Sequence, residues 1–222
     1  MNVEVHTLRF LGAAQLLVFL ASVLSEQLLK SVVGSGSIAA ILINISENVA
    51  RIQLSNLIAL INSLAIIVLG VLFYATLNQQ EKTLALVALG CFLAEAIILA
   101  VSKIGTYALI PLSRDFVAAG APESTHFQTL GDALYHSVDR RGYDIHMLFF
   151  CLGGSLWYFL LYRSGYVPPA LALWGLVAIC LLSVPVLFTL LERESLPVMI
   201  LGLPYAPYEL VLGIWLIVKG FH

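Results

Sequence analysis

Long apolar segments separated by short polar ones run along the whole chain. The clearest lies between Tyr143 and Pro169 and ends in a mixed group of aromatic and basic residues just before two prolines. About eighteen apolar residues are enough to cross the hydrocarbon core of a bilayer as a helix. Aromatic and basic side chains at the end of such a helix are typical of the membrane interface. This segment therefore predicts a membrane-spanning helix followed by a tight turn.

Six segments of this kind predict six membrane-spanning helices. We expect them at residues 8–29, 55–77, 84–109, 144–162, 170–191 and 197–219. The third is expected to end before Pro111, because proline removes a backbone donor and clashes with the preceding turn. Pro185 is expected inside the fifth as a kink. We expect residues 1–222 to form a single six-span membrane domain.

Two other segments have the pattern of amphipathic helices. Between residues 38 and 52, apolar and polar positions recur on opposite faces at helical spacing, after a Gly-Ser break that ends in a helix-capping residue, Ser37. Residues 123–138 show a similar pattern. Such helices lie in the interface or pack over the mouth of a bundle. The predicted fold class is all-α, an integral membrane bundle of six transmembrane helices plus two amphipathic interfacial helices.

The composition supports a membrane protein and argues against several functional classes. Hydrophobic residues make up 60% of the chain, charged residues 11%, and the mean hydropathy is +0.97. An ordinary soluble domain has about 25% charged residues, so the lipid bilayer is the expected partner. The net charge is −2 and the basic residues are scattered, so we expect no nucleic-acid partner. The oligomeric state does not follow from the sequence.

Ionisable residues at or within the apolar segments are the candidate site residues: Arg9, Glu95, His146 and Glu209. A charged side chain at the bilayer centre costs about 2.5–3.5 kcal/mol on insertion scales, so such residues usually face the bundle interior and pair. They predict either a central polar site for a ligand, a proton or an ion, or buried pairs that only fix helix packing. As further alternatives, His146 is interfacial and Arg9 extends to the lipid headgroups.

The sixth apolar segment has an unusual first half. Pro197, Gly202, Pro204 and Pro207 precede Glu209, which predicts irregular backbone followed by a half-helix that restarts near Pro207. Glu209 would then lie in the first turn of that half-helix. Broken helices with a charged residue at the break mark binding sites in transporters. The alternative is a proline-kinked helix in which Glu209 bonds to a neighbouring span.

Histidines at positions 126, 136 and 146 recur with aspartates among them, but they lack the tight spacing of a helical zinc site. We therefore expect no metal site. Of these histidines, His146 is the one near a span, and axial haem ligation needs two well-placed ligands within the spans. We expect no haem and no other cofactor.

Spans four to six contain a recognisable set of residues. They are His146 with Phe149, Phe150 and Gly153-Gly154; Tyr158; Tyr162-Arg163-Ser164; Pro168-Pro169-Ala170-Leu171-Ala172; Trp174-Gly175; Pro207 with Glu209; and the segment from Trp215 to Phe221. With Arg9, Gly12 and Glu95, the pattern resembles a bacterial and archaeal multi-pass membrane family known as domain of unknown function 4386. This resemblance covers essentially the whole chain and brings no known activity.

The resemblance also bears on orientation. Members of this family tend to have a basic N-terminus, which implies that this end lies inside, whereas this chain begins with Met1-Asn2-Val3-Glu4-Val5-His6. A raw count of Lys and Arg favours the opposite orientation. Since an even number of spans returns the chain to its starting side, we expect a multi-pass protein of the cell membrane with both termini on the same, cytoplasmic side.

Three hypotheses follow for function. The leading one is a non-enzymatic membrane module with a central cavity lined by Glu95, His146 and Glu209, which binds or passes a small or lipid-like ligand. The second is a membrane-embedded enzyme that acts on lipid or isoprenoid substrates, with His146 and a glutamate as an acid–base pair. The third is a structural subunit or scaffold of a membrane complex, whose polar residues lock helix packing. No catalytic residue is otherwise identified.

Overall fold

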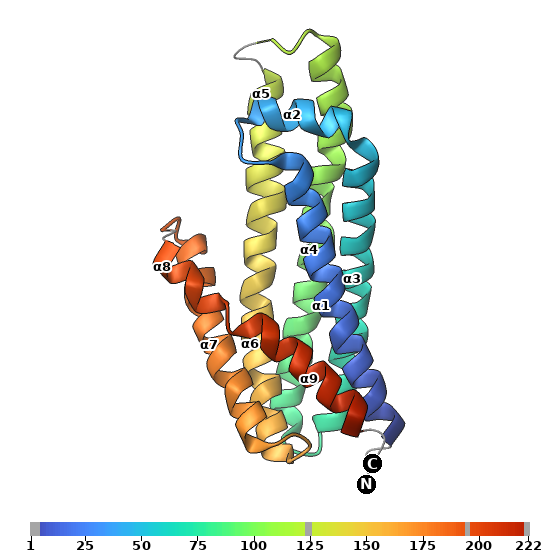
Figure 1. The fold of residues 1–222 in the computed structure, drawn as a ribbon, viewed down its shortest axis with the longest axis vertical. Helices are drawn as coiled ribbons and strands as arrows, with labels where there is room; N and C mark the ends of the chain where they lie inside the picture. The colour runs from blue at the N-terminus through green and yellow to red at the C-terminus, as the bar shows by residue number, and fades with distance from the viewer. Residues whose placement is uncertain (1–4, 123–125, 194–195, 220–222) are drawn as a thin grey trace. The chain divides into compact units, whose positions relative to one another are not determined.

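A computed structural model of the chain describes residues 5–122, 126–193 and 196–219, which form helices joined by short turns (Figure 1). Six of the helical stretches are long and apolar enough to cross a membrane, and a shorter apolar helix accompanies them. These findings confirm the prediction of an all-α, multi-pass membrane bundle.

The helices have the following bounds. They are α1 (Val5–Val33), α2 (Ile38–Glu47), α3 (Val49–Leu77), α4 (Lys82–Ala118), α5 (His126–Asp132), the π-helix η1 (Ala133–Arg140), α6 (Arg141–Ser164), α7 (Pro169–Leu190), α8 (Leu196–Met199), the 3-10 helix η2 (Ile200–Gly202) and α9 (Tyr205–Lys219). The described part of the second amphipathic segment is helical, but it is not a separate helix, because α5, η1 and α6 follow one another without a gap. Residues 123–125 of that segment lie outside the described residues.

The helix that contains the third predicted span, α4, extends beyond that span. The expected end before Pro111 is wrong, since α4 continues through this proline to Ala118. Proline removes one intrahelical hydrogen bond, whereas ending the helix there would expose several backbone groups. Within a membrane each such group must find a partner, so a continuous helix with one missing hydrogen bond has the lower free energy.

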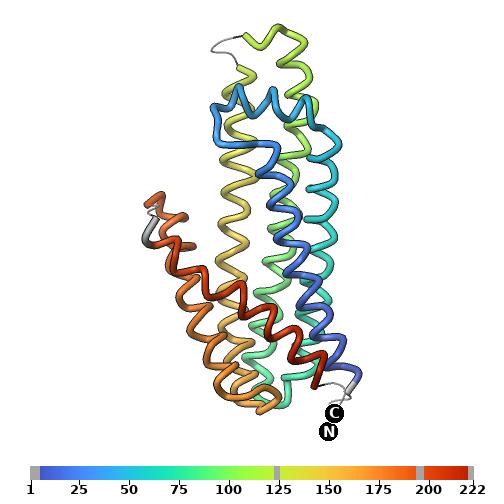
Figure 2. Tube along the Cα trace, viewed as in Figure 1, coloured from blue at the N-terminus to red at the C-terminus, as the bar shows by residue number. Residues whose placement is uncertain are grey.

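The sixth span is broken, as the prolines predict. The chain passes from α8 through η2 to a turn at Leu203 and Pro204, and α9 then begins at Tyr205. The trace changes direction there (Figure 2). The half-helix starts two residues before Pro207, so this proline lies within the first turn, where backbone N–H groups have no intrahelical acceptor. Glu209 therefore follows shortly after a helix N-terminus.

Two compact units are distinguished by their internal contacts. Unit 1 comprises Met1–Phe19, Leu64–Ile97 and Asp144–His222, and unit 2 comprises Leu20–Ser63 and Ile98–Tyr143. In unit 1, Phe73 and Trp157 stack with ring centroids 5.2 Å apart, and Phe92 packs edge-on against both. A Cβ atom at Gly153 would lie 2.7 Å from the Phe92 ring, so this glycine allows α4 and α6 to approach closely.

Unit 2 has its own apolar core at the end where α2 lies. Figure 1 shows α2 lying across the neighbouring helices of this unit instead of along them. Ser37 caps α2, as predicted, by accepting a hydrogen bond from the backbone N–H of Ala40. The buried face of α2 supplies Ile41, Leu42 and Ile45 to a cluster that includes residues of α1, α3 and α4. Asn48 separates α2 from α3, so the first amphipathic helix does not run unbroken into the second span.

Candidate functional site

Glu209 lies in unit 1 where α9 packs against the first half of α1. The Gln15 side-chain N–H group donates a 2.8 Å hydrogen bond to Oε1 of Glu209. Three residues earlier in α1, Gly12 meets Gly213, whose carbonyl oxygen would lie 2.6 Å from a Cβ at position 12. From the first contact to the second, the residue number falls in α1 and rises in α9, so the two helices are antiparallel here. The glycines bring the helices together, and the amide and carboxyl groups meet beside them.

Tyrosines extend this hydrogen-bonded group. The hydroxyl of Tyr205 donates to Oε1 of Glu209 over 3.3 Å, and the hydroxyls of Tyr205 and Tyr158 share a further hydrogen bond. Tyr208 packs edge-on against Tyr158, with ring centroids 4.9 Å apart. A Cβ at Gly175 would lie 2.2 Å from the Tyr208 hydroxyl, so only glycine leaves room for this ring. These contacts therefore join α1, α6, α7 and α9.

Glu95 and His146 belong to the same cluster. His146 Nδ1 lies 3.9 Å from Oε1 of Glu95, which is within ion-pair range and longer than a hydrogen bond. The other carboxylate oxygen of Glu95, Oε2, is buried and has no hydrogen-bond partner among the described residues. Glu95 also interacts electrostatically with Glu209. We call the group formed by Gln15, Glu95, His146, Tyr158, Tyr205 and Glu209 the acidic cluster.

The structure thus brings together three of the four residues singled out by the sequence. Arg9 is the exception. It precedes Gly12 in α1 and, because α1 and α9 are antiparallel, it lies toward the C-terminal end of α9 and away from Glu209. Arg9 is half-buried, whereas Glu95, His146 and Glu209 are at most 8% exposed.

The chemistry of the acidic cluster is that of an electron-rich, buried site. The groups that donate to Glu209 are an amide and a phenol, both neutral. His146 is the one group described in contact with Glu95 that can carry a positive charge. Burying an uncompensated carboxylate is costly, so two such groups in one cluster favour the uptake of a positive charge, a proton included.

A second polar cluster lies in unit 2 and was missed by the analysis of the sequence. Lys103 Nζ donates to Oδ1 of Asp139 over 2.7 Å, and Arg140 binds Oδ2 of the same carboxylate over 2.9 Å. Arg140 also reaches Glu26 through a 2.8 Å hydrogen bond. We call Glu26, Lys103, Asp139 and Arg140 the ionic quartet. Asp139 is fully buried and Lys103 is 4% exposed.

The π-helix η1 positions the quartet. It supplies both Asp139 and Arg140, and its backbone packs against α4 at Gly105, where a Cβ would lie 2.4 Å from the Leu134 carbonyl oxygen. π-Helices are rare and occur frequently at functional sites. Arg140 is also held over the ring of Tyr143, 5.2 Å from its centroid.

A signal for these residues was present in the sequence. Glu26 and Lys103 both fall inside predicted apolar spans, at 8–29 and 84–109, and the rule that selected Glu95 applies to them equally. No sequence pattern identifies Asp139 and Arg140, because they lie in a polar segment and become buried only when η1 packs against α4.

Residues 10–220 match the protein family described as Domain of unknown function (DUF4386). The chain belongs to this family. The predicted resemblance is therefore confirmed, and the matched region contains the acidic cluster and the ionic quartet, while Arg9 lies just outside it. No match was found among curated proteins, and none among solved structures.

The family and the six apolar helices together identify a multi-pass membrane protein. Within the part of the chain that the structure describes, no group of three or more His, Cys, Asp or Glu side chains could hold a metal ion. Of the predicted histidine–aspartate region, His136 and Asp132 form an exposed pair at 3.0 Å.

Proposed function

We propose that this DUF4386 protein binds a small cation, either inorganic or an organic ammonium, at the acidic cluster. The observation that carries the proposal is the buried pair of carboxylates. Glu95 and Glu209 interact electrostatically, and Oε2 of Glu95 has no hydrogen-bond partner among the described residues. With both carboxylates ionised and His146 protonated, the charges of the cluster would sum to one negative charge, which a bound cation would neutralise.

The surroundings of the cluster support a cationic ligand. Besides the two carboxylates, the cluster contains the oxygen atoms of two phenols and one amide, and hard cations prefer oxygen ligands. An inorganic cation would need these neutral oxygens as well, because no three acidic, histidine or cysteine side chains among the described residues could hold a metal ion. Five aromatic rings pack in one continuous group around the phenols: Phe150, Tyr158, Trp174, Tyr205 and Tyr208. Faces of aromatic rings attract cations, including quaternary ammonium groups. Inorganic and organic cations thus share the chemistry that the cluster offers.

The break before α9 gives the site a means of access. The N-terminal turn of α9 presents backbone donors close to Glu209, as in transporters with broken helices, where half-helix ends form the substrate site near the bilayer midplane. Irregular backbone at this depth must line a cavity or be covered by protein. The broken α8–η2–α9 segment therefore provides the element that rearranges when a ligand enters or leaves.

The test is a measurement of cation-dependent thermal stability in mild detergent. Sodium, potassium and choline are titrated at constant ionic strength, with N-methylglucamine as the balancing cation. At least one of them is expected to stabilise the protein in a saturable manner, since a ligand that binds only the folded state raises stability by mass action. Native mass spectrometry of the same sample identifies a retained organic ligand.

Glu209→Gln and Glu95→Gln are expected to abolish this stabilisation, because each removes one of the negative charges that attract the ligand. Glu81→Gln is the matched control, since Glu81 is an exposed glutamate in the turn between α3 and α4. If all three variants respond to cations as the wild type does, the acidic cluster is not the site and the proposal is wrong.

A second candidate is a membrane-embedded enzyme that acts on lipid or isoprenoid substrates. The observation in its favour is the 3.9 Å separation of His146 Nδ1 and Glu95 Oε1, since catalytic hydrogen bonds are often long without substrate and shorten in the complex. Its test is incubation of the protein with extracted lipids, followed by mass spectrometry of the products. A product that His146→Asn fails to form would support it.

A further inference from the structure

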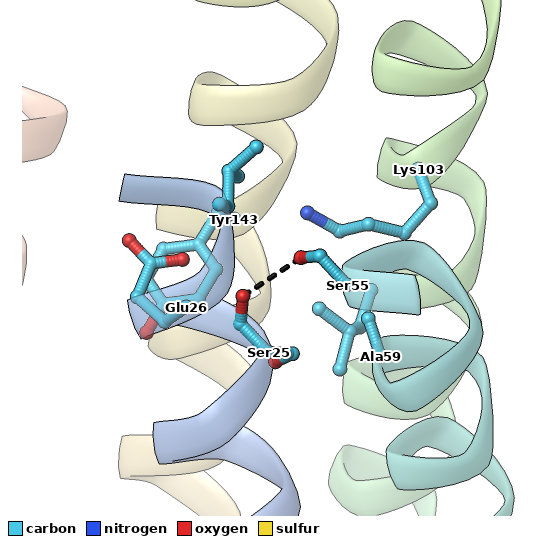
Figure 3. A pocket seen from close by; sticks show the side chains of 8 residues that line it. Ser25, Glu26, Ser55, Ala59, Lys103 and Tyr143 are labelled. Atoms are coloured by element: carbon cyan, nitrogen blue, oxygen red, sulfur yellow. Dashed lines mark hydrogen bonds between the residues drawn. The ribbon is translucent and has the colours of Figure 1, made fainter. Parts of the chain in front are cut away.

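A recess in unit 2 lies beside the ionic quartet, among α1, α3, α4 and the start of α6 (Figure 3). Its lining residues are Ser25, Glu26, Leu29, Ser55, Ala59, Leu99, Lys103 and Tyr143. The space inside is small, with room for about one water molecule. Its lining combines polar and apolar side chains, so it is neither a dry packing defect nor a pocket for a lipid.

One side of the recess offers hydrogen-bond donors. The Lys103 ammonium group has three N–H donors, and among the described residues it donates to Asp139 at 2.7 Å. In Figure 3 the Lys103 side chain extends past the Ser55 hydroxyl toward the side of the recess where Glu26 and Tyr143 lie. Since Lys103 is 4% exposed, bulk solvent does not supply acceptors for its other N–H groups. An acceptor inside the recess would satisfy them.

Other residues that line the recess offer acceptors. Ser55 uses its hydroxyl hydrogen to donate to the backbone oxygen of Ser25 at 2.7 Å, and Ser25 donates in the same way to the backbone oxygen of Ser22 at 3.1 Å. Both hydroxyl oxygens therefore keep lone pairs that can accept. The Glu26 carboxylate, held by Arg140, adds further acceptor capacity at the edge of the recess.

Charge decides which ligand fits. The two carboxylates of the quartet, Glu26 and Asp139, are matched by the two cations that the quartet contains, Lys103 and Arg140. Lys30 also pairs with Glu26, over 3.3 Å, but its side chain is 65% exposed, so its charge is screened more strongly than those of the quartet. An additional cation in the recess would meet the Lys103 ammonium, and an anion would meet the Glu26 carboxylate. The ligand must be neutral, must accept from an ammonium and donate to a hydroxyl or carboxylate oxygen, and must be about as large as water.

We propose that this recess is a binding site for a single internal water molecule, which accepts a hydrogen bond from Lys103 and donates to the Ser25 or Ser55 hydroxyl or to Glu26. Buried waters typically make about three hydrogen bonds to polar groups that would otherwise lack partners. The site allows the ionic quartet to stay charged inside a membrane-spanning unit. It is independent of the acidic cluster and of the cation proposed there.

Neighbouring residues extend the polar character of this region. The buried Nδ2 of Asn56 has no hydrogen-bond partner among the described residues. Its Oδ1 accepts a 2.8 Å hydrogen bond from the Thr106 hydroxyl. Asn62, on the same helix, donates to Ser22 at 2.8 Å, and its buried Oδ1 has no partner in the described structure. Unit 2 therefore contains a buried polar seam between α1, α3 and α4, and the water site lies along it.

X-ray radiolytic footprinting of the full-length protein tests the proposal. The beam converts bound water into hydroxyl radicals, which oxidise adjacent side chains, and H₂¹⁸O reports exchange of that water. Leu29 and Leu99 line the recess and are only 2% and 4% exposed. Leu69 is the matched control, because it is 2% exposed and does not line the recess. We expect Leu29 and Leu99 to be oxidised several-fold faster than Leu69.

A variant that fills the recess sharpens the test. Ala59→Val adds two methyl groups to the lining and is expected to bring oxidation of Leu99 down to the rate of Leu69. If this variant does not fold, Ser55→Ala provides a milder change that removes one acceptor and is expected to lower the same rate. Equal oxidation of Leu29, Leu99 and Leu69 in the wild type would overturn the proposal, as would unchanged oxidation in a folded variant.

Discussion

The ionic quartet of unit 2 and the acidic cluster of unit 1 are both buried in membrane-spanning helices, but they differ in how their charges are matched. In the quartet, two carboxylates bind two cations over distances of 2.7–2.9 Å. In the acidic cluster, two carboxylates share neutral hydrogen-bond donors and one imidazole 3.9 Å away. The ions of the first arrangement are paired within the protein, whereas we propose that a bound cation pairs with the carboxylates of the second.

This difference separates a structural role from a binding role. Removing one member of a matched buried pair leaves a charge without its partner, which strongly destabilises a protein. Removing one of two carboxylates that repel each other relieves an unfavourable interaction and instead removes a ligand. Stability and binding measurements should therefore respond in opposite ways in the two units.

The largest effect is expected for Asp139→Asn, because it takes a negative charge from both Lys103 and Arg140. Breaking a buried ion pair typically costs about 3–5 kcal/mol, measured here as the free energy of unfolding in mixed micelles. Asp132→Asn is the control, since the Asp132 side chain is 61% exposed, and it should change stability by less than about 0.5 kcal/mol. A loss for Asp139→Asn no larger than that of the control would show that the quartet is not structural.

Alanine at two contact glycines should give intermediate effects. At Gly105 a Cβ would lie 2.4 Å from a backbone oxygen of η1, and at Gly175 it would lie 2.2 Å from the Tyr208 side chain. Overpacking of this kind costs about 1–3 kcal/mol. We expect the larger loss of thermal stability at Gly105, because a backbone atom moves less readily than a side chain. Gly90→Ala is the control and should be neutral or stabilising, because a Cβ there would have nothing within 4 Å. Similar losses of stability at all three positions would contradict the prediction that close contacts cause them.

Glu95→Gln should have a smaller effect on stability than Asp139→Asn, and in the opposite direction. The substitution removes a buried charge that interacts with Glu209 while keeping the size of the side chain. We expect the free energy of unfolding, measured without added sodium, potassium or choline, to stay within about 1 kcal/mol of the wild type or to rise. A loss comparable to that of Asp139→Asn would mean that the acidic cluster is itself a matched structural network.

The smallest effect should come from a neutral hydrogen bond in unit 2. Asn62 Nδ2 donates to Ser22 Oγ at 2.8 Å, and the coupling between these side chains can be measured with a double-mutant cycle of Asn62→Ala and Ser22→Ala. Hydrogen bonds between membrane helices average about 0.6 kcal/mol in such cycles. A coupling free energy of several kcal/mol would make this neutral pair as strong as a buried ion pair. The contrast between charged and neutral groups would then be wrong.

The sequence by itself determined the class of protein and the presence of six long apolar helices. Apolar runs long enough to cross a bilayer have few alternatives to a helix, and the prolines before Glu209 predicted the broken sixth span. The prediction that a helix ends at Pro111 was wrong, because one missing hydrogen bond does not end a helix whose other backbone groups need partners inside a membrane.

Only the tertiary structure decided which polar groups meet. Glu95, His146 and Glu209 lie far apart in the sequence, and helix packing at Gly12, Gly153 and Gly213 brings their helices close together. Spacing along one helix predicts partners three or four residues apart, but it carries no information about partners on other helices. For the same reason, the burial of Asp139 was not predicted from its polar segment, because that burial depends on the backbone of η1 packing against Gly105.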